Sequence, residues 1–220
     1  MFGYGIFFAI MTLIGAIALV RFLAEQKRQK GVKLLADQLG LEHTATLSEV
    51  DYLRFQRFPI ASEGRQRTAF GSIVAEANGL RMVLFDYRYV KGSGKHRRTY
   101  HFGILMVQNP NFRIPSFTLE IASWQSRFAT FFGGQDIVID QDVEFSKRYR
   151  LQGAEPERIQ AFMTSPRRQE LMLRQDECVQ GVGDCFIIYR RRKHLQPQEI
   201  QPWMSRGLAL AEAFSEAEKS

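Results

Sequence analysis

The chain has 220 residues, 45% of them apolar and 12% aromatic, and its 30 Lys and Arg against 23 Asp and Glu give a net charge of +7. This composition excludes a disordered chain and allows a buried core for one domain or two small ones. Two cysteines are too few for a disulfide framework, which favours a reducing compartment, and the positive excess favours anionic partners such as a membrane surface.

An uncharged stretch opens the chain. Residues 2–20 contain no charged side chain, and at about 1.5 Å per residue a helix of this length crosses the hydrocarbon layer. No basic residue precedes the stretch and no small-residue cleavage site follows it, so a retained anchor is favoured over a signal peptide or a buried soluble helix. We predict a transmembrane anchor over residues 1–22. The side chains that we expect to anchor it in the membrane are Phe2, Tyr4, Phe7, Phe8, Leu13, Leu19 and Arg21.

The residues just after this stretch are mostly basic. Over residues 21–33, Arg and Lys side chains are opposed by a single acidic one, Glu25. The positive-inside rule places the basic side of a membrane helix in the cytoplasm. We therefore expect a single-pass protein of a bacterial inner membrane or its equivalent, with the N-terminus outside and the C-terminal domain cytoplasmic.

The patterns after the anchor predict an α+β fold. We expect a juxtamembrane basic helix over residues 23–40 and a cytoplasmic domain over residues 41–220, with a candidate sub-boundary near residues 133–145. The helix has a rough apolar stripe and stops at Gly40. Thr46 and Glu49 form a capping-box pattern that predicts a short helix near residues 47–58, ended by Pro59.

Strands are predicted where apolar side chains alternate. The pattern places strands at residues 67–77, 80–90, 99–107 and 116–121, and Asn78-Gly79 predicts a hairpin between the first two. One strand puts Val83, Phe85, Tyr87 and Tyr89 on one face, and the next gathers Tyr100, Phe102, Ile104 and Met106. Together these segments predict an antiparallel meander whose central hairpin is rich in aromatic residues.

The second half mixes helices and strands. We expect a short helix over residues 124–132, strands over 137–143 and 145–151, helices over 157–163, 167–175 and 198–217, and a hairpin of strands 177–182 and 185–191. A turn followed by a strand ending Tyr-Arg-Tyr near residue 89 is echoed by a turn and a strand ending Tyr-Arg-Arg at residue 191. This echo raises the alternative of two similar halves.

Two basic segments are the candidate binding surfaces. The loop at residues 91–98 reads KGSGKHRR, and it is not a Walker phosphate loop because His96 stands where Ser or Thr is needed. It is either a flexible hairpin loop or a surface for lipid headgroups or an acidic partner. Nucleic acid is disfavoured by the anchor, and Tyr87 and Tyr89 fit a hairpin core as well as a base-stacking surface. The candidate anion-binding residues are Lys91, Lys95, Arg97, Arg98, Arg190, Arg191, Arg192 and Lys193.

An acidic patch and two thiols are the candidate chemical groups. On a strand, Asp140, Asp142 and Glu144 would share one face and offer oxygen ligands to Mg²⁺ or Ca²⁺; the alternative is a charged strand edge. Cys178 and Cys185 would face each other across a hairpin centred on Gly181-Val182, as a disulfide or a redox pair, although buried thiols suit a cytoplasmic domain better. The sequence contains no cofactor signature, and we expect no cofactor.

Three segments resemble a group of bacterial single-pass membrane proteins. They are VLFDYRYVKGSG at residues 83–94, FFGGQDIVI at 131–139 and EFSKRYRLQG at 144–153. The group has one N-terminal membrane helix and a cytoplasmic domain with a Phe-Asp-Tyr-x-Tyr strand, and it carries no assigned activity. Members often show Gln-Thr-Val where this chain has His101-Phe102-Gly103. The resemblance implies a bacterial origin and this topology, and it implies no catalytic residue.

The leading hypothesis is a membrane-anchored, non-enzymatic accessory, assembly or scaffold protein of a bacterial membrane complex. Membrane lipids and a membrane protein complex are its expected partners. One alternative is a module that binds anionic lipid headgroups or a small anionic ligand through the basic segments. A further alternative is an enzyme acting at the membrane surface with the acidic patch and a divalent ion.

Overall fold

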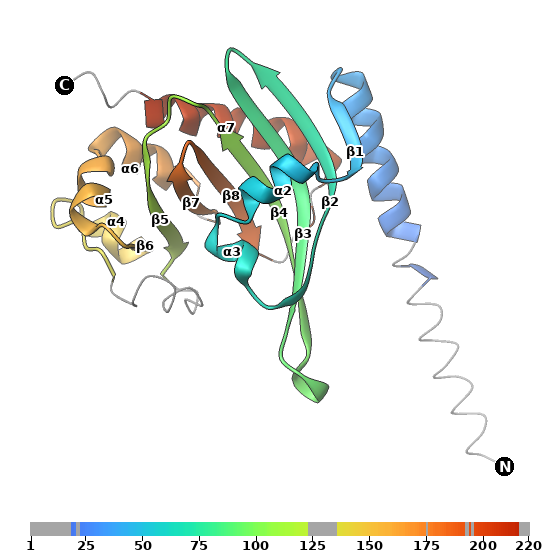
Figure 1. Cartoon of the computed structure of the whole chain (residues 1–220), viewed down its shortest axis with the longest axis horizontal. Coiled ribbons are helices and arrows are strands. Elements are labelled where there is room, and N and C mark those ends of the chain that lie inside the picture. Colours follow the sequence, from blue (N-terminus) through green and yellow to red (C-terminus); the bar gives the residue numbers. More distant parts are fainter. Residues whose placement is uncertain are drawn as a thin grey trace.

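The computed structural model describes residues 19–20, 23–122, 136–174, 176–191, 194 and 196–215. They form an α+β fold, with one eight-stranded antiparallel sheet and helices on both of its faces (Figure 1). The expected α+β class is confirmed. Within the described residues, no helix combines the length and the apolar character that crossing a membrane requires.

The sheet has the strand order β1-β2-β3-β4-β8-β7-β5-β6. Its strands are β1 (Glu42–Thr46), β2 (Arg65–Ala77), β3 (Leu80–Lys91), β4 (Arg98–Gln108), β5 (Ile114–Ile121), β6 (Tyr149–Gly153), β7 (Cys178–Gly183) and β8 (Cys185–Arg191). Strands from before and after the candidate sub-boundary pair in this one sheet, and the division into sub-domains or similar halves stays a prediction.

The central hairpin matches its prediction closely. Asn78 and Gly79 turn the chain with φ angles of 52° and 77°, as an Asn-Gly hairpin turn requires. The side chains expected on one face of β3 and β4 do pack in a single buried cluster. The meander is partial, because β8 lies between β4 and β7, so that β5 does not follow β4 in the sheet.

One face of the sheet carries the larger core. It is covered by the N-terminal helix (residues 23–38), α5 (Pro156–Phe162), α6 (Ser165–Met172) and α7 (Ile200–Ser215), which follows the short 3-10 helix η2 (Pro197–Glu199). Leu84 and Leu105 from the sheet meet Trp203 and Leu210 from α7 in this cluster. In the N-terminal helix Val32 and Ala36 are buried, whereas Leu34 is 60% exposed.

The other face is covered by two short helices, α2 (Glu49–Phe55) and α3 (Pro59–Ser62). Phe55 packs edge-on against Phe85 and Tyr87, with ring centroids 5.1 and 4.8 Å apart. The N-cap of α2 lies two residues after the predicted Thr46. It is Ser48, whose side chain accepts a hydrogen bond from the Asp51 N–H. Pro59 begins α3 rather than simply ending the previous helix.

Two predictions in the second half were wrong. Residues 137–143 do not form a strand, and α4 (Val143–Arg148) occupies the start of the segment expected as the next strand. The helix forms because the Asp142 side chain accepts a bond from the Phe145 N–H and caps its first turn. Strand β1 was missed. The helix expected over residues 124–132 lies outside the described residues.

Candidate functional site

The most prominent feature of the described chain is a long basic hairpin. Strand β8 pairs with β4 from Phe102 to Gln108, so the first residues of β4 pair with β3 alone. The pairing of β3 with β4 continues to Lys91 and Arg98. On its other side β2 follows β3 as far as the Arg65–Val90 pair, so the hairpin extends past the described end of β8 but stays paired with β2. The loop with the 3-10 helix η1 (Gly94–His96) forms its end (Figure 1).

Gly92 shapes the loop. Its φ angle is +77°, a conformation that L side chains rarely adopt. A Cβ atom at this position would lie 2.3 Å from the carbonyl oxygen of His96. The loop is closed by hydrogen bonds from the His96 N–H to the Ser93 carbonyl and from the Arg97 N–H to the Gly94 carbonyl. These bonds and the positive φ of Gly92 define the shape of the turn.

Aromatic stacking stiffens the stem below this loop. Tyr89 stacks on Tyr100 and Phe102, with ring centroids 5.3 and 5.4 Å apart. Tyr87 and Tyr89 are 1% and 2% exposed, so they cannot stack on nucleic-acid bases without unfolding the hairpin. The stem therefore acts as a stiff support for the charges at its tip.

We call Arg65, Lys91, Lys95, Arg97 and Arg98 the basic tip. Arg65 belongs to β2 and donates from Nη2 to the Gly92 carbonyl at 2.7 Å, and Arg97 donates to the side chain of Gln66 at 2.9 Å. Lys91 pairs with Glu63. Within the described part of the chain, the other four cations of the tip make no ion pair, so the tip keeps most of its positive charge. The four predicted hairpin residues are thus brought together.

The N-terminal helix is fixed to the large-core face of the sheet by a buried ion pair. Arg28 binds Asp86 of β3 at 2.7 Å and Glu25 at 2.6 Å, and the Arg28 and Asp86 side chains are 9% and 5% exposed. The hydrogen bond from Arg28 holds the pKa of Glu25 below its usual value. A Cβ atom on Gly31 would lie 2.9 Å from the Pro197 ring, so the helix also packs closely against η2.

Two histidines join this network from neighbouring segments. The His194 ring lies 3.7 Å from the Asp86 carboxylate and its centroid is 4.4 Å from that of His101 on β4. Burial, and then the nearby His194, lower the pKa of His101. This cluster was not predicted, because the alternation in β3 was used only to define its apolar face. Asp86 and Arg88, polar residues at the alternate positions, were the available signal.

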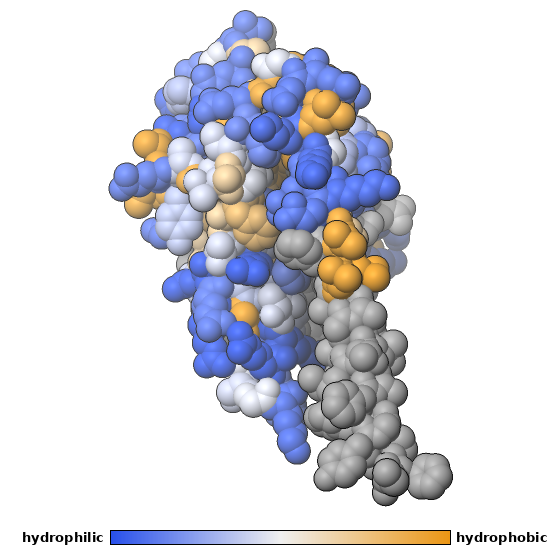
Figure 2. Space-filling model, turned by 90° about the vertical axis from the view of Figure 1, so that its right-hand side faces the viewer, coloured by the Kyte–Doolittle hydropathy of each residue, from blue (hydrophilic) through white to orange (hydrophobic). Residues whose placement is uncertain are grey.

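Exposed apolar side chains lie at the start of the N-terminal helix and shortly before it in the chain. Leu19, Val20 and Leu23 are 57%, 66% and 57% exposed. Figure 2 shows an apolar patch at this end of the helix, and the hydrophilic hairpin reaches out on the same side of the molecule. The predicted anchor residues Phe2, Tyr4, Phe7, Phe8, Leu13 and Arg21 lie outside the described residues.

In the second predicted basic segment, Arg190 is the residue whose side chain the structure describes, and it does not join the tip. Arg190 is 15% exposed at its side chain and pairs with Glu177 at 2.9 Å, Asp176 at 3.4 Å and Glu199 at 3.6 Å. Its guanidinium also lies over the Trp203 ring. These three carboxylates neutralise Arg190, so it is not a free surface cation. The Arg191 side chain, Arg192 and Lys193 lie outside the described residues.

The acidic patch does not form the expected strand face. Asp142 caps α4 and pairs with Arg168 at 2.8 Å, while the exposed Glu144 pairs with Lys147 one turn along the helix. Asp140 lies in a turn before α4. No group of three or more potential metal ligands occurs among the described residues, and the arrangement that suggested a metal site is absent there.

The two thiols lie apart in the hairpin. Cys178 is opposite Tyr189 and Cys185 is opposite Val182, because the turn is centred further along the chain than Gly181-Val182. Neither cysteine forms a disulfide and both are buried, as the alternative reading predicted. Burial raises the pKa of the Cys185 thiol to about 12, which leaves it protonated and unreactive at neutral pH.

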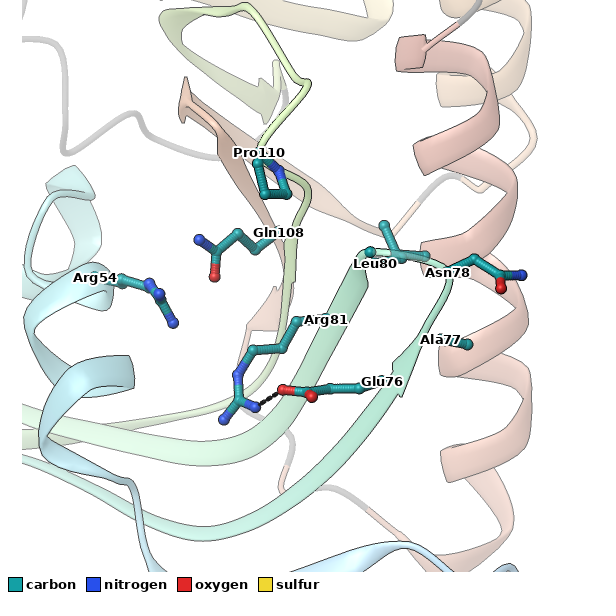
Figure 3. Close-up of a pocket in the computed structure, with 9 residues that line it drawn as sticks. Arg54, Glu76, Ala77, Asn78, Leu80, Arg81, Gln108 and Pro110 are labelled. Carbon is teal, nitrogen blue, oxygen red and sulfur yellow. Dashed lines mark hydrogen bonds and ion pairs between the residues drawn. The ribbon is translucent and has the colours of Figure 1, made fainter.

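A cavity of about 470 Å³ opens beside the β2–β3 turn. Figure 3 shows Arg54 from α2 across this cavity from Arg81, which is bonded to Glu76. Arg81 and Arg54 also pair with Asp51, at 2.7 and 3.4 Å. The hydrogen bond to Asp51 raises the pKa of Arg81. Since two arginines face two carboxylates, this cavity has little net charge and no free nucleophile.

The fold is that of an antiparallel sheet with helices on both faces and a long basic hairpin. No protein-family model and no curated protein matches the sequence. A solved structure does match: the crystal structure of the mycobacterial trehalose monomycolate transport factor A, TtfA, with a TM-score of 0.56 and 8% sequence identity. The match covers 87% of this chain and 94% of that chain. At this identity the likeness shows a shared fold.

Proposed function

We propose that this protein is a membrane-anchored accessory factor whose domain is held over an anionic bilayer surface. The observation that carries the proposal is the placement of the basic tip on the same side of the molecule as the apolar start of the N-terminal helix (Figure 2). The predicted anchor over residues 1–22 would continue from that helix into the bilayer. Two separate attachments would then fix the orientation of the domain.

The charges of the tip suit a contact with lipid headgroups. Each Lys or Arg near an anionic bilayer contributes about 1 kcal/mol, and this attraction falls off within roughly one Debye length. Lys95, Arg97 and Arg98 are exposed at the end of a stiff hairpin, where they would approach a membrane before the sheet does. The expected cytoplasmic location of the domain supplies the anionic leaflet that this contact needs.

The accessory role is supported by the fold. A transport factor, TtfA, shares this architecture over nearly its whole length. Of the groups that suggested chemistry in the sequence, Asp142 and Glu144 are ion-paired, and Cys178 and Cys185 are buried. The leading hypothesis therefore stays with a non-enzymatic partner of a membrane protein complex, placed in a bacterial inner membrane by the charge pattern of residues 21–33.

A pull-down tests the accessory role. Tagged full-length protein is extracted from native membranes in mild detergent and co-purifying proteins are identified by mass spectrometry. We expect a membrane protein complex to co-purify in fixed stoichiometry. A monomer or homodimer that carries no membrane protein partner in any mild detergent would refute the accessory role.

The membrane contact of the tip is tested in nanodiscs. A fluorophore is attached at Ser93→Cys, because both native cysteines are buried, and its quenching by spin-labelled lipids is measured with and without anionic lipid. We expect quenching in anionic nanodiscs that is lost in Lys95→Gln/Arg98→Gln. The matched control Lys147→Gln/Arg158→Gln removes two exposed cations from α4 and α5, with side chains 69% and 54% exposed. Quenching that ignores anionic lipid or tip charge would refute this contact.

A further inference from the structure

A second cavity, of about 320 Å³, lies at the end of the molecule where α5, α6 and α7 meet. It is lined by Arg113 from the loop after β4, Phe162 at the end of α5, Thr164 and Arg167 at the start of α6, and Phe214 in the last turn of α7. In Figure 1 these helices lie away from the hairpin tip. The cavity is therefore separate from the surface proposed to face the membrane.

Arg167 is fixed in place at the wall of this cavity. Its side chain is buried, with the residue 4% exposed. It donates from Nε to the Ala213 carbonyl at 3.0 Å, from Nη1 to the Phe162 carbonyl at 2.6 Å and from Nη2 to the Phe214 carbonyl at 2.9 Å. The guanidinium also lies 3.9 Å from the centroid of the Phe162 ring. A guanidinium has five N–H donors, so two remain for another acceptor.

Arg167 differs from the other buried arginines in its ion pairing. Arg168 pairs with Asp142, and Arg206 pairs with Glu177 and Glu170. Within the described ranges, by contrast, Arg167 makes no ion pair. Burial lowers the pKa of Arg167 to about 10, so it remains a cation at neutral pH. A buried cation that lacks a counter-ion is costly, because hydrogen bonds to carbonyls return only part of the lost hydration.

The carbonyls that hold Arg167 offset part of its charge. They include the last carbonyls of α7, where the helix dipole is equivalent to roughly half a negative charge. A full positive charge still exceeds this value. Arg113 adds a second guanidinium to the cavity, held by the Pro110 and Phe112 carbonyls at 2.9 and 2.8 Å. No Asp or Glu lines the cavity among the described residues, in contrast to the neutral cavity beside Arg81.

We propose that this cavity binds a small anion that carries a carboxylate or phosphate group. Its oxygens accept hydrogen bonds from the free donors of Arg167 and Arg113, as guanidinium groups commonly provide to planar or tetrahedral oxyanions. The Thr164 side chain makes no capping bond to α6, which leaves its hydroxyl available to the same anion. Phe162 and Phe214 give the cavity an apolar wall for the body of the ligand.

A soluble anion fits this position better than the headgroup of a bilayer lipid, because α5, α6 and α7, which line the cavity, lie away from the hairpin tip (Figure 1). This preference for a soluble anion rests on the proposed function, whereas the proposal that the cavity binds an anion does not. Binding here would provide a ligand-responsive element next to the last turn of α7, which packs across the sheet against β3 and β4.

The test is a titration of the full-length protein in detergent, by calorimetry and thermal shift. The probes are inorganic phosphate, phenyl phosphate, benzoate and a short-chain phosphatidate, with chloride at matched ionic strength as the reference. We expect saturable binding of at least one probe. Phenyl phosphate that binds as tightly as the phosphatidate identifies a soluble anion; a strong preference for the phosphatidate identifies a lipid headgroup as the source of the phosphate.

The variants separate binding from folding. Arg167→Gln removes three bonds to the backbone and can impair folding, so the decisive variant is the exposed Arg113→Gln. We expect it to weaken binding about tenfold or more, while the control Arg158→Gln on α5 binds like the original protein. The proposal is overturned if no anion binds saturably or if Arg113→Gln binds unchanged. It is also overturned if binding appears only after residues 216–220 are removed, because the chain would then supply its own anion.

Discussion

A single buried charge pair joins the N-terminal helix to the sheet. We expect Asp86→Asn to lower the free energy of unfolding by about 3 kcal/mol, because it leaves the buried Arg28 guanidinium with the more exposed Glu25 as its charged partner. Urea unfolding of the full-length protein in detergent measures this change. Glu144→Gln breaks the exposed pair with Lys147 and should cost less than about 0.5 kcal/mol. Equal effects of the two variants would contradict the assignment.

His101 gives the same region a pH dependence. Its pKa is lowered in the folded protein, by burial first and then by His194. The unfolded chain therefore takes up a proton at a higher pH than the folded one, and stability falls as the pH drops below about 6.5. We expect His101→Gln to reduce the loss of stability between pH 7.5 and 5.5, whereas the exposed His96→Gln leaves it unchanged. Thermal unfolding across this pH range measures the change in stability. A steeper loss of stability with falling pH in His101→Gln would contradict the prediction.

The shape of the hairpin depends on one glycine. In Gly92→Ala the new Cβ would meet the His96 carbonyl oxygen, at a φ angle that L side chains rarely adopt. We expect the loop to rearrange and the amides of residues 93–98 to exchange hydrogen faster. Gly94→Ala is the matched control, because its φ is also positive but its Cβ would have open space. Hydrogen exchange by mass spectrometry distinguishes them; equal exchange in both variants would show that strain alone, without the clash, determines the loop.

Elements that contain their own pattern could be predicted, and elements that depend on a distant partner could not. The alternation in β3 and β4 defined their buried face from the sequence alone. Strand β1 reads EHTAT and is mostly exposed, so it is a strand only because β2 pairs with it. Helix α4 was read as a strand because its cap, Asp142, also depends on Arg168, which is 26 residues away in the chain.

The same distinction applies to the candidate sites. Four residues of the basic tip, Lys91, Lys95, Arg97 and Arg98, were predictable because they lie together in or beside one loop. Arg65 was not, because it joins the tip from β2. Arg190 was misjudged as a surface cation because Glu177 and Glu199, which neutralise it, come from other segments. The cavity at Arg167 had no sequence signal, since its walls are built from α5, α6, α7 and the loop after β4.

At the scale of the whole molecule, the two proposed attachments to the membrane differ in kind. The N-terminal helix is joined to the domain by buried contacts of Arg28, Val32 and Ala36. The basic tip would meet the bilayer through exposed charges. Salt screens exposed charges within a Debye length, which is about 30 Å at 0.01 M and about 3 Å at 1 M, and it screens buried pairs much less. The two attachments should therefore respond differently to ionic strength.

We expect high salt to release the tip while the helix stays docked. In anionic nanodiscs, raising the salt concentration from about 0.05 to about 0.5 M should abolish lipid quenching at Ser93→Cys, because the Debye length shrinks several-fold. Hydrogen exchange of residues 23–38 should stay slow at both salt concentrations, because Val32 and Ala36 remain buried. Asp86→Asn should show the reverse behaviour, with faster exchange in the helix and quenching that persists at low salt. If loss of lipid quenching at the tip always accompanies faster hydrogen exchange in the helix, the two form a single coupled attachment. The proposal of two separate attachments is then wrong.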